Sequence, residues 1–282
     1  MKHYKIMDEY KLYSYEDPNI QSINRLEPRV YFREFKNLDD ALHFDISNRG
    51  NIIDLNGKWY FKLFDSPIYI TKKLIKDTTM IKMDEIIVPI PWQMSGFGKM
   101  HYSDVWWTFP ITPPKVSSNN PTGFYKKNVI IKEIDKNIDY ILRLHGSDSC
   151  VKIYINFQKI GLTKGSRYTS EFNITNFLKN GENEIIIICY QWSDGSYLED
   201  QDQWWFSGLY RNIEILLEKK KFIKNICVKT LRKSETKYDL NLSIKSKEDI
   251  NSVSISLYDF DKKLIFSRNN KFVKNNIEFR DE

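Results

Sequence analysis

Cysteine is scarce in this chain, and its pattern excludes two common structural frameworks. The 282 residues include three cysteines, an odd number, with none of the Cys-x-x-Cys or Cys/His spacings typical of zinc sites. Cys150 and Cys189 lie inside apolar runs, where a free thiol behaves as a small hydrophobic group. We therefore expect reduced thiols in an intracellular protein, without a disulfide framework or a structural zinc.

Long apolar segments are missing as well. Residues 1–10 contain no apolar core of the kind found in signal peptides. No run approaches the roughly 20 residues of a membrane-spanning helix. We therefore expect a cytoplasmic protein with no membrane partner.

Charge of one sign is not concentrated in any large region. Lys and Arg number 43 against 37 Asp and Glu, giving a net charge of +6, with one small basic cluster at 218–224. A nucleic-acid-binding protein usually gathers basic residues on one face beside a recognisable reading motif. The sequence has no such motif, no glycine-rich phosphate loop, and no histidine beside a Ser or Cys nucleophile motif. We expect no nucleic-acid partner.

Helical periodicity is weak, and strand patterns dominate. Segments rich in β-branched and aromatic residues are separated by turn residues. The clearest of these segments are 58–64, 123–131, 140–145, 151–156, 184–190 and 211–217. The best helical candidate is a short turn near 169–178. Many short strands, without the helices that parallel crossovers need, predict an all-β sandwich or jelly roll rather than an α/β fold.

The pattern divides the chain into three regions. Residues 1–50 carry scattered charges and few strand signals, which predicts an extended N-terminal arm. Residues 51–217 contain the first set of strands, and a lysine-rich break follows. Apolar and polar residues then alternate within 218–282, as in half-buried strands of a sandwich. An immunoglobulin-like sandwich needs about seven strands in ~100 residues, so we expect this second domain to be truncated.

The densest group of chemically useful side chains lies at 193–208. Glu199, Asp200 and Asp202 shortly precede the aromatic run 204–206. Carboxylates accept hydrogen bonds from ring hydroxyls, and aromatic faces cover the C–H faces of a sugar, so this mixture suits sugar binding. The alternative is a loop whose acids are solvated and whose aromatics fill the core beneath it.

A series of motifs occurs in a characteristic order over residues 20–217. The series includes Leu-Asn-Gly-Lys-Trp-Tyr-Phe at 55–61, Pro-Trp-Gln at 91–93, His-Tyr-Ser-Asp-Val at 101–105 and Trp-Ser-Asp-Gly-Ser-Tyr-Leu-Glu-Asp-Gln-Asp at 192–202. Each short motif is weak alone. As an ordered set they resemble the glycoside hydrolase family 2 β-galactosidases, and the last motif is the most specific.

The resemblance implies a particular domain order. In that family a jelly-roll β-sandwich, similar to a galactose-binding domain, precedes an immunoglobulin-like sandwich and then a catalytic (β/α)8 barrel. The barrel carries both catalytic glutamates and the magnesium site. This sequence ends before such a barrel would begin. The resemblance therefore implies that this chain has no catalytic residue, no magnesium ligand and no activity alone.

The resemblance also implies two site residues. Asp202 corresponds to a residue that coordinates a sodium ion beside the galactose, with further ligands from the barrel, and hard oxygen ligands suit this cation. Asp104 corresponds to a residue that hydrogen-bonds the sugar. The commoner family form has Asn at this position and a shorter loop, without the inserted Trp106 and Trp107.

Neighbouring residues are expected to serve mainly the scaffold. Glu199 and Asp200 would hold the loop through hydrogen bonds or ion pairs, and Trp204 would pack in the core. Trp106 and Trp107 offer a sugar platform, although we expect at least one of them to pack inward.

These inferences predict the N-terminal, non-catalytic portion of a β-galactosidase. The complete enzyme would hydrolyse terminal β-D-galactosides such as lactose with retention of configuration. This chain would contribute to sugar and sodium binding, and its arm to the assembly of a homo-oligomer. Two alternatives remain. One is a stand-alone carbohydrate-binding module, and the other is an assembly subunit that complements a separately encoded catalytic chain.

Overall fold

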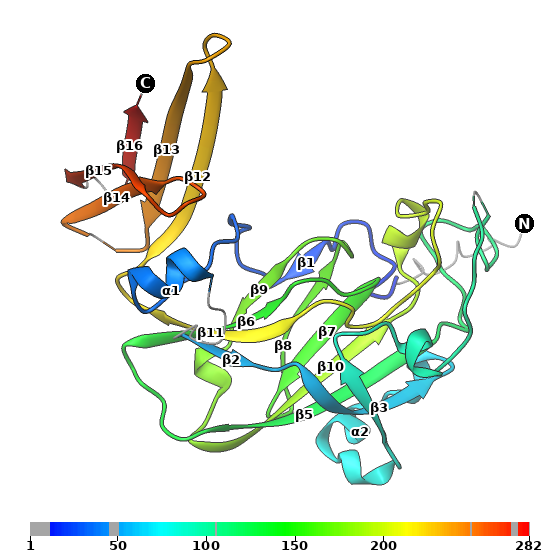
Figure 1. Cartoon of the computed structure of the whole chain (residues 1–282). Helices are drawn as coiled ribbons and strands as arrows, with labels where there is room; N and C mark the ends of the chain where they lie inside the picture. The colour runs from blue at the N-terminus through cyan, green and yellow to red at the C-terminus, as the bar shows by residue number, and fades with distance from the viewer. Residues whose placement is uncertain (1–11, 45–50, 105, 249, 272–275, 282) are drawn as a thin grey trace, which may run out of the picture. The chain divides into compact units, whose positions relative to one another are not determined.

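The protein consists mainly of β-strands in two compact units (Figure 1). The computed structural model describes residues 12–44, 51–104, 106–248, 250–271 and 276–281. The first unit comprises Met1–Leu26, Asp54–Ile134 and Ile141–Ile215, and the second comprises Glu27–Ile53, Asp135–Tyr140 and Leu216–Glu282. The all-β fold class predicted from the strand patterns is confirmed.

Seven strands form the larger sheet of the first unit. In spatial order they are β1 (Ser22–Ile23), β8 (Gln158–Lys164), β7 (Cys150–Ile155), β10 (Gly181–Tyr190), β5 (Thr122–Ile131), β3 (Gly57–Phe64) and β4 (Asp84–Val88). Each neighbouring pair is antiparallel. Antiparallel neighbours need no crossover helix, which agrees with the weak helical periodicity of the sequence.

A smaller sheet completes the sandwich. Its order is β2 (Ile52–Asp54), β11 (Ile213–Lys219), β6 (Ile138–Leu144) and β9 (Ser170–Asn173). The strands β2, β6 and β11 each contribute residues to both units. The two sheets pack closely where β9 crosses β8, because a Cβ added at Gly161 would lie 2.6 Å from the ring of Phe172.

Helices are few and short among the described residues. They are α1 (Leu38–His43) and α2 (Lys72–Lys76), with single 3₁₀ turns η2 (Pro67–Tyr69), η3 (Thr78–Met80), η4 (Trp92–Ser95), η5 (Thr175–Phe177) and η6 (Asp194–Tyr197). Polar N-caps begin several of them; the side chain of Thr71, for example, accepts a hydrogen bond from the backbone N–H of Leu74. Of the helical turn expected near 169–178, only the single turn η5 forms, because residues 170–173 pair as strand β9. None of the helices in the described ranges has the length and apolar character needed to cross a membrane.

The central strand β10 is buried on both faces, which explains its unbroken apolar run. Its residues 185–190 are each at most 5% exposed. On one face they pack in a cluster with Tyr15 from the N-terminal segment and Ile75 from α2. Within the run, Cys189 is a buried free thiol, as expected for a small hydrophobic group.

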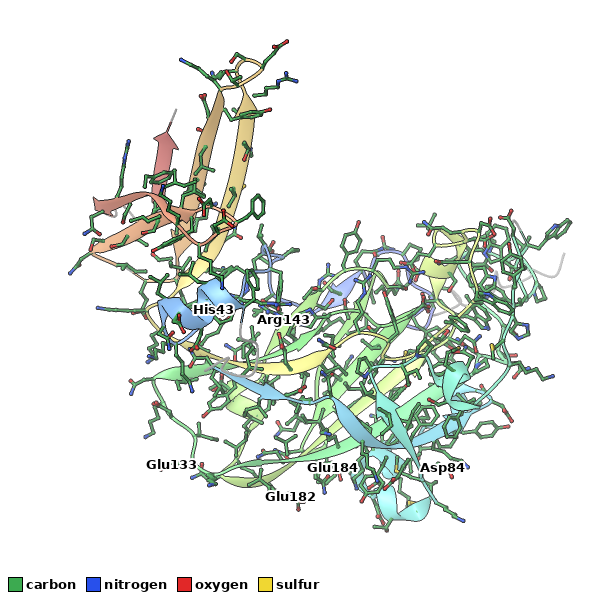
Figure 2. The ribbon with its side chains drawn as sticks, in the orientation of Figure 1. His43, Asp84, Glu133, Arg143, Glu182 and Glu184 are labelled. Atoms are coloured by element: carbon green, nitrogen blue, oxygen red, sulfur yellow. The ribbon has the colours of Figure 1, made fainter. Side chains whose placement is uncertain are left out.

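A buried ionic group lies on strands β6, β9 and β11. Arg143, labelled in Figure 2, donates from Nε to Oε1 of Glu171 at 2.6 Å and from Nη1 to Oε1 of Glu214 at 3.3 Å. The Nε2 atom of His145 lies 2.9 Å from the same Glu214 oxygen. Because these opposite charges are held together, they offset part of the cost of burying each one.

The second unit contains a three-stranded sheet and a separate two-stranded ladder. The sheet is formed by β12 (Ile223–Arg232), β13 (Tyr238–Ser246) and β16 (Asn276–Asp281), and the ladder by β14 (Ser252–Tyr258) and β15 (Leu264–Lys271). Residues 27–44 of the predicted arm belong to this unit. Arg29 pairs there with Glu218, and Asn225 accepts a hydrogen bond from the backbone N–H of Val30 at 2.9 Å.

Candidate functional site

The loop of acids and aromatics at 193–208 begins with a closed turn. The backbone N–H of Ser193 donates to Oγ of Ser196 at 3.1 Å, and the N–H of Ser196 donates to the carbonyl of Ser193 at 2.9 Å. Asp194 forms a buried ion pair with Lys164 of β8 at 2.6 Å. The start of the loop is therefore fixed to the larger sheet.

Glu199 fixes the middle of the loop to a neighbouring turn. Its Oε1 accepts from the backbone N–H of Ser166 at 2.9 Å, and its Oε2 accepts from the Ser166 hydroxyl at 2.5 Å. The hydroxyl of Tyr210 donates to the carbonyl of Ser166 at 2.5 Å. Hydrogen bonds to an ionised carboxylate are among the stronger ones. Hydrogen bonds of this kind are what we expect if Glu199 holds the loop in place.

The end of the loop is attached to Asp148. The backbone N–H of Gly208 donates to the carbonyl of Asp148 at 2.9 Å, and the reverse bond is 3.0 Å. Gly208 has a φ of 111°, and a Cβ there would lie 2.5 Å from the hydroxyl of Tyr125, so this position requires glycine. The carboxylate of Asp148 pairs with Arg167 at 2.9 Å. Burial nevertheless raises the pKa of Asp148 to about 6.

The two tryptophans of the loop face opposite sides. Trp205 packs at the core cluster, 5.3 Å from the ring of Trp192, and its Nε1 donates to Oγ of Ser103 at 2.8 Å. Trp204 is 50% exposed and stacks on Phe206. The expectation that Trp204 lies in the core is wrong. Successive side chains of extended backbone point to opposite faces, and Trp205 takes the inward position.

The loop at 101–107 lies beside this loop. An isolated antiparallel bridge joins Tyr102 to Trp204, and the backbone N–H of Trp205 donates to the carbonyl of His101 at 2.9 Å. The hydroxyl of Tyr102 donates a hydrogen bond to Oδ1 of Asp202. The structure therefore brings together two motifs that the family resemblance singled out.

Tyr102 is a candidate that the sequence analysis missed. It lies within the quoted His-Tyr-Ser-Asp-Val motif, but the expectation for that motif concerned Asp104 alone. The sequence could have pointed to Tyr102 because it lies only two residues before Asp104. Its hydrogen bond with Asp202 forms only in the folded chain.

Asp104 and Asp202 both have exposed side chains. Near Asp104, Trp106 is 71% exposed, whereas Trp107 packs inward and donates from Nε1 to the carbonyl of Ser196 at 3.2 Å. The expectation that at least one of these tryptophans packs inward is confirmed. Exposed carboxylates beside an exposed indole are accessible to a sugar. The roles assigned to Asp104 and Asp202 stay predictions.

Negative charge accumulates where the two loops meet. Burial, and then the charge of Asp104, raises the pKa of Asp200. The hydrogen bond to Asp202 raises the pKa of Tyr102. Oδ1 of Asp200 is buried and accepts no hydrogen bond within the described part of the chain. Such a site favours cations and hydroxyl donors.

The donor set fits a sodium ion in part. Carboxylate oxygens are hard ligands of the kind such a cation takes, and Asp202 offers an exposed carboxylate oriented by Tyr102. The described residues contain no group of three or more His, Cys, Asp or Glu side chains arranged to hold a metal ion. Within the described residues, Asp202 can offer such an ion one exposed carboxylate.

Comparisons with known proteins identify the family of the strand-rich region at 52–219. The sequence model of glycosyl hydrolases family 2, sugar binding domain, matches residues 52–219. A β-galactosidase of Alteromonas mediterranea is 34% identical over 218 residues, which are 76% of this chain and 21% of that protein. A β-galactosidase of Staphylococcus xylosus is 31% identical over 247 residues, which are 87% of this chain and 24% of that protein.

A solved structure shows the same fold. The β-glucuronidase of an uncultured Clostridium sp. matches with a TM-score of 0.57 at 15% identity, covering 89% of this chain and 41% of that chain. This chain spans only 21% and 24% of the length of the two β-galactosidases above. Together, the family match and these identities show that the chain belongs to glycoside hydrolase family 2, whose sugar-binding domain it carries at residues 52–219.

Proposed function

We propose that this chain supplies substrate-binding loops to a cytoplasmic β-galactosidase, which hydrolyses terminal β-D-galactosides such as lactose. The observation that carries the proposal is the junction of the loops at 101–107 and 193–208 through Tyr102 and Asp202. The relatives that are 34% and 31% identical are named β-galactosidases. The junction also places exposed carboxylates beside exposed aromatic rings, the combination that sugars require.

Asp104 and Asp202 bind the sugar in this proposal. Their carboxylates accept hydrogen bonds from galactosyl hydroxyls, and Asp202 also supplies one ligand to a sodium ion. When bound, the ion would offset the negative charge of the loops and attract a sugar hydroxyl oxygen. Tyr102 holds Asp202 in one orientation through its hydrogen bond. We assign the magnesium site to another part of the enzyme.

The bond-breaking chemistry belongs to another part of the enzyme. Retaining glycosidases use two carboxyl groups roughly 5 to 5.5 Å apart, one as nucleophile and one as acid/base. We assign both to a (β/α)8 barrel, joined to this chain or carried by a complementing subunit. The N-terminal arm then contributes to assembly of a homo-oligomer, and this chain alone is inactive.

Complementation tests this proposal. The purified chain is mixed with a barrel-containing fragment of the Staphylococcus xylosus enzyme that lacks the matching N-terminal region, and hydrolysis of o-nitrophenyl β-galactoside is followed. We expect sodium-dependent activity from the mixture and from neither part alone. Asp202→Asn should lower that activity by about tenfold or more, because even the loss of a group that supports a metal ligand commonly costs tenfold or more in metal affinity or activity.

The matched control for Asp202→Asn is Asp65→Asn, which removes an exposed carboxylate outside both loops. This control should leave the restored activity unchanged. Size-exclusion chromatography reports whether the two parts associate at all. Failure to associate, or equal activity in the two variants, would contradict the proposal.

A stand-alone carbohydrate-binding module is the second candidate. It is favoured by the exposure of two indole rings, 71% for Trp106 and 50% for Trp204. Calorimetric titration of the isolated chain with galactose and lactose decides between the two. A dissociation constant below the millimolar range would support a self-sufficient module. The absence of heat would contradict the module and favour the non-catalytic portion of a β-galactosidase.

A further inference from the structure

A pocket lies on the face of the larger sheet covered by the N-terminal segment, next to the start of the loop at 193–208, where the backbone N–H of Asp194 donates to the carbonyl of Tyr15 at 3.0 Å. Its volume is about 410 Å³, and β7, β10, η2 and the segment around Tyr15 contribute to its walls. None of its lining residues falls in 101–107 or 193–208. Small-molecule sites typically have volumes of roughly 300 to 1,000 Å³, so the space is large enough for a ligand.

Lys152 is the unusual residue of this pocket. It lies on β7, paired in register with Leu162 on one side and Ile188 on the other, both of them buried. Burial lowers the pKa of its ammonium group. Throughout the described ranges, no carboxylate forms an ion pair with Lys152. The side chain of Lys152 is half-buried, and a charge that is partly removed from water gains from a counter-charge.

Two tyrosine rings, those of Tyr15 and Tyr190, lie near this ammonium group. The rings of Tyr13 and Tyr15 stack at 5.4 Å, and those of Tyr15 and Tyr190 stack at 4.6 Å. The Nζ atom of Lys152 lies 6.0 Å from the centre of the Tyr15 ring and 5.1 Å from that of Tyr190. These rings attract the cation without neutralising it. Burial raises the pKa of Tyr15 and Tyr190, so their hydroxyls stay protonated and able to donate.

The one carboxylate that lines the described pocket is already engaged. Oε1 of Glu16 accepts from the backbone N–H of Val116 at 3.1 Å, and Oε2 accepts from that of Tyr13 at 3.4 Å. A second lysine, Lys72, lies among the lining residues with an exposed side chain. The pocket therefore combines positive charge, protonated hydroxyls and flat apolar rings.

We propose that this pocket binds a small aromatic carboxylate. The carboxylate pairs with the ammonium of Lys152, and the aromatic ring packs against the tyrosine rings in an offset or edge-on arrangement. A neutral sugar fits less well, because it brings no counter-charge for Lys152. The proposal is independent of the function assigned to the loops at 101–107 and 193–208.

Calorimetric titration of the full 282-residue chain with sodium benzoate tests the proposal. We expect binding in the millimolar range or tighter. Benzyl alcohol has a similar ring without the charge, and acetate has the charge without the ring. Each should bind at least about tenfold more weakly, because a charged hydrogen-bonded contact and a buried ring each contribute this much.

Two lysine variants locate the site. Lys152→Met removes the charge while keeping a long apolar side chain, and should weaken benzoate binding by about tenfold or more. Lys132→Met makes the same charge change at an exposed position outside the pocket and should leave binding unchanged. Circular dichroism and thermal unfolding verify that both variants fold.

A further variant covers the case in which Lys152→Met does not fold. Tyr13 is 63% exposed, and Tyr13→Ala should weaken benzoate binding by about threefold through loss of ring contact. The proposal is overturned if benzoate does not bind up to its solubility limit. It is equally overturned if benzyl alcohol binds as well as benzoate, or if the folded pocket variants bind benzoate with unchanged affinity.

Discussion

The hydroxyl of Tyr102 donates a hydrogen bond to Oδ1 of Asp202, and this bond joins two loops whose residues are 100 positions apart in the chain. The carboxylate stabilises the protonated hydroxyl, which raises the pKa of Tyr102. The bond also restricts the rotamers of an exposed aspartate, which would otherwise lose conformational entropy when it binds a ligand. The candidate site therefore depends on a contact that neither motif contains alone.

Tyr102→Phe tests this positioning role, and it rests on the proposed β-galactosidase function. The variant keeps the ring, whose centre lies 5.6 Å from that of Trp204, and removes only the hydroxyl. In the complemented enzyme we expect the sodium concentration for half-maximal activity to rise by about tenfold, because groups that orient metal ligands commonly have this effect. Tyr69→Phe, at an exposed tyrosine outside the loops, should change nothing. An unaltered sodium requirement in Tyr102→Phe would contradict the role.

Glu199→Ala should destabilise the first unit. The substitution leaves the backbone N–H and the hydroxyl of Ser166 without their acceptor. We expect the free energy of unfolding to fall by about 1–3 kcal/mol, the usual cost of an unsatisfied polar group. Urea titration followed by tryptophan fluorescence measures the loss. Glu133→Ala, at an exposed glutamate labelled in Figure 2, is the matched control, and an equal loss there would argue against this anchor.

Asp148 should make stability fall as the pH rises through the mildly acidic range. Burial raises the pKa of its carboxyl from 3.8 to about 6, although Arg167 opposes part of this shift. Between these two values the folded protein retains a proton that the unfolded chain has released. The contribution of Asp148 is therefore most favourable below pH 3.8 and is lost as the pH rises through about 6.

The Asp148→Asn variant has no titratable group at this position. Its free energy of unfolding should therefore fall less steeply as the pH rises. Urea titrations of both proteins at several pH values across this range give the free energy of unfolding for each. The free energy of unfolding of the unaltered protein minus that of Asp148→Asn should decrease as the pH rises from 3.8 to about 6. Parallel pH profiles would show that Asp148 does not titrate with a raised pKa in the folded protein.

Gly161→Ala should loosen the N-terminal segment from the larger sheet. A Cβ at this position would lie 2.5 Å from the carbonyl oxygen of Ile23 and 2.6 Å from the ring of Phe172. We expect a loss of about 1–3 kcal/mol, as for other overpacked sites, and faster amide hydrogen exchange near β1. Gly195→Ala, whose Cβ would meet its nearest atom at 3.4 Å, should cost less. Similar losses in the two variants would exclude steric displacement as the cause.

Local patterns predicted the strands that are themselves rich in aromatic and β-branched residues. The expected segments 58–64 and 123–131 became β3 and β5 with nearly the same bounds. The strand β8 (Gln158–Lys164) was not predicted, because Gly161, Thr163 and Lys164 interrupt the apolar pattern. These residues are buried by partners from β1, β7 and β9, which no local pattern specifies.

The sequence by itself determined the all-β class, the family resemblance and the chemistry available in the loop at 193–208. The tertiary structure alone decided that Trp205 rather than Trp204 faces the core, and that Tyr102 meets Asp202. It alone showed that Lys152 lies against two tyrosine rings. Strand propensity and motif order act over a few residues and are visible in the chain. The direction of a side chain and the identity of its partner depend on packing between distant segments, which exists only after folding.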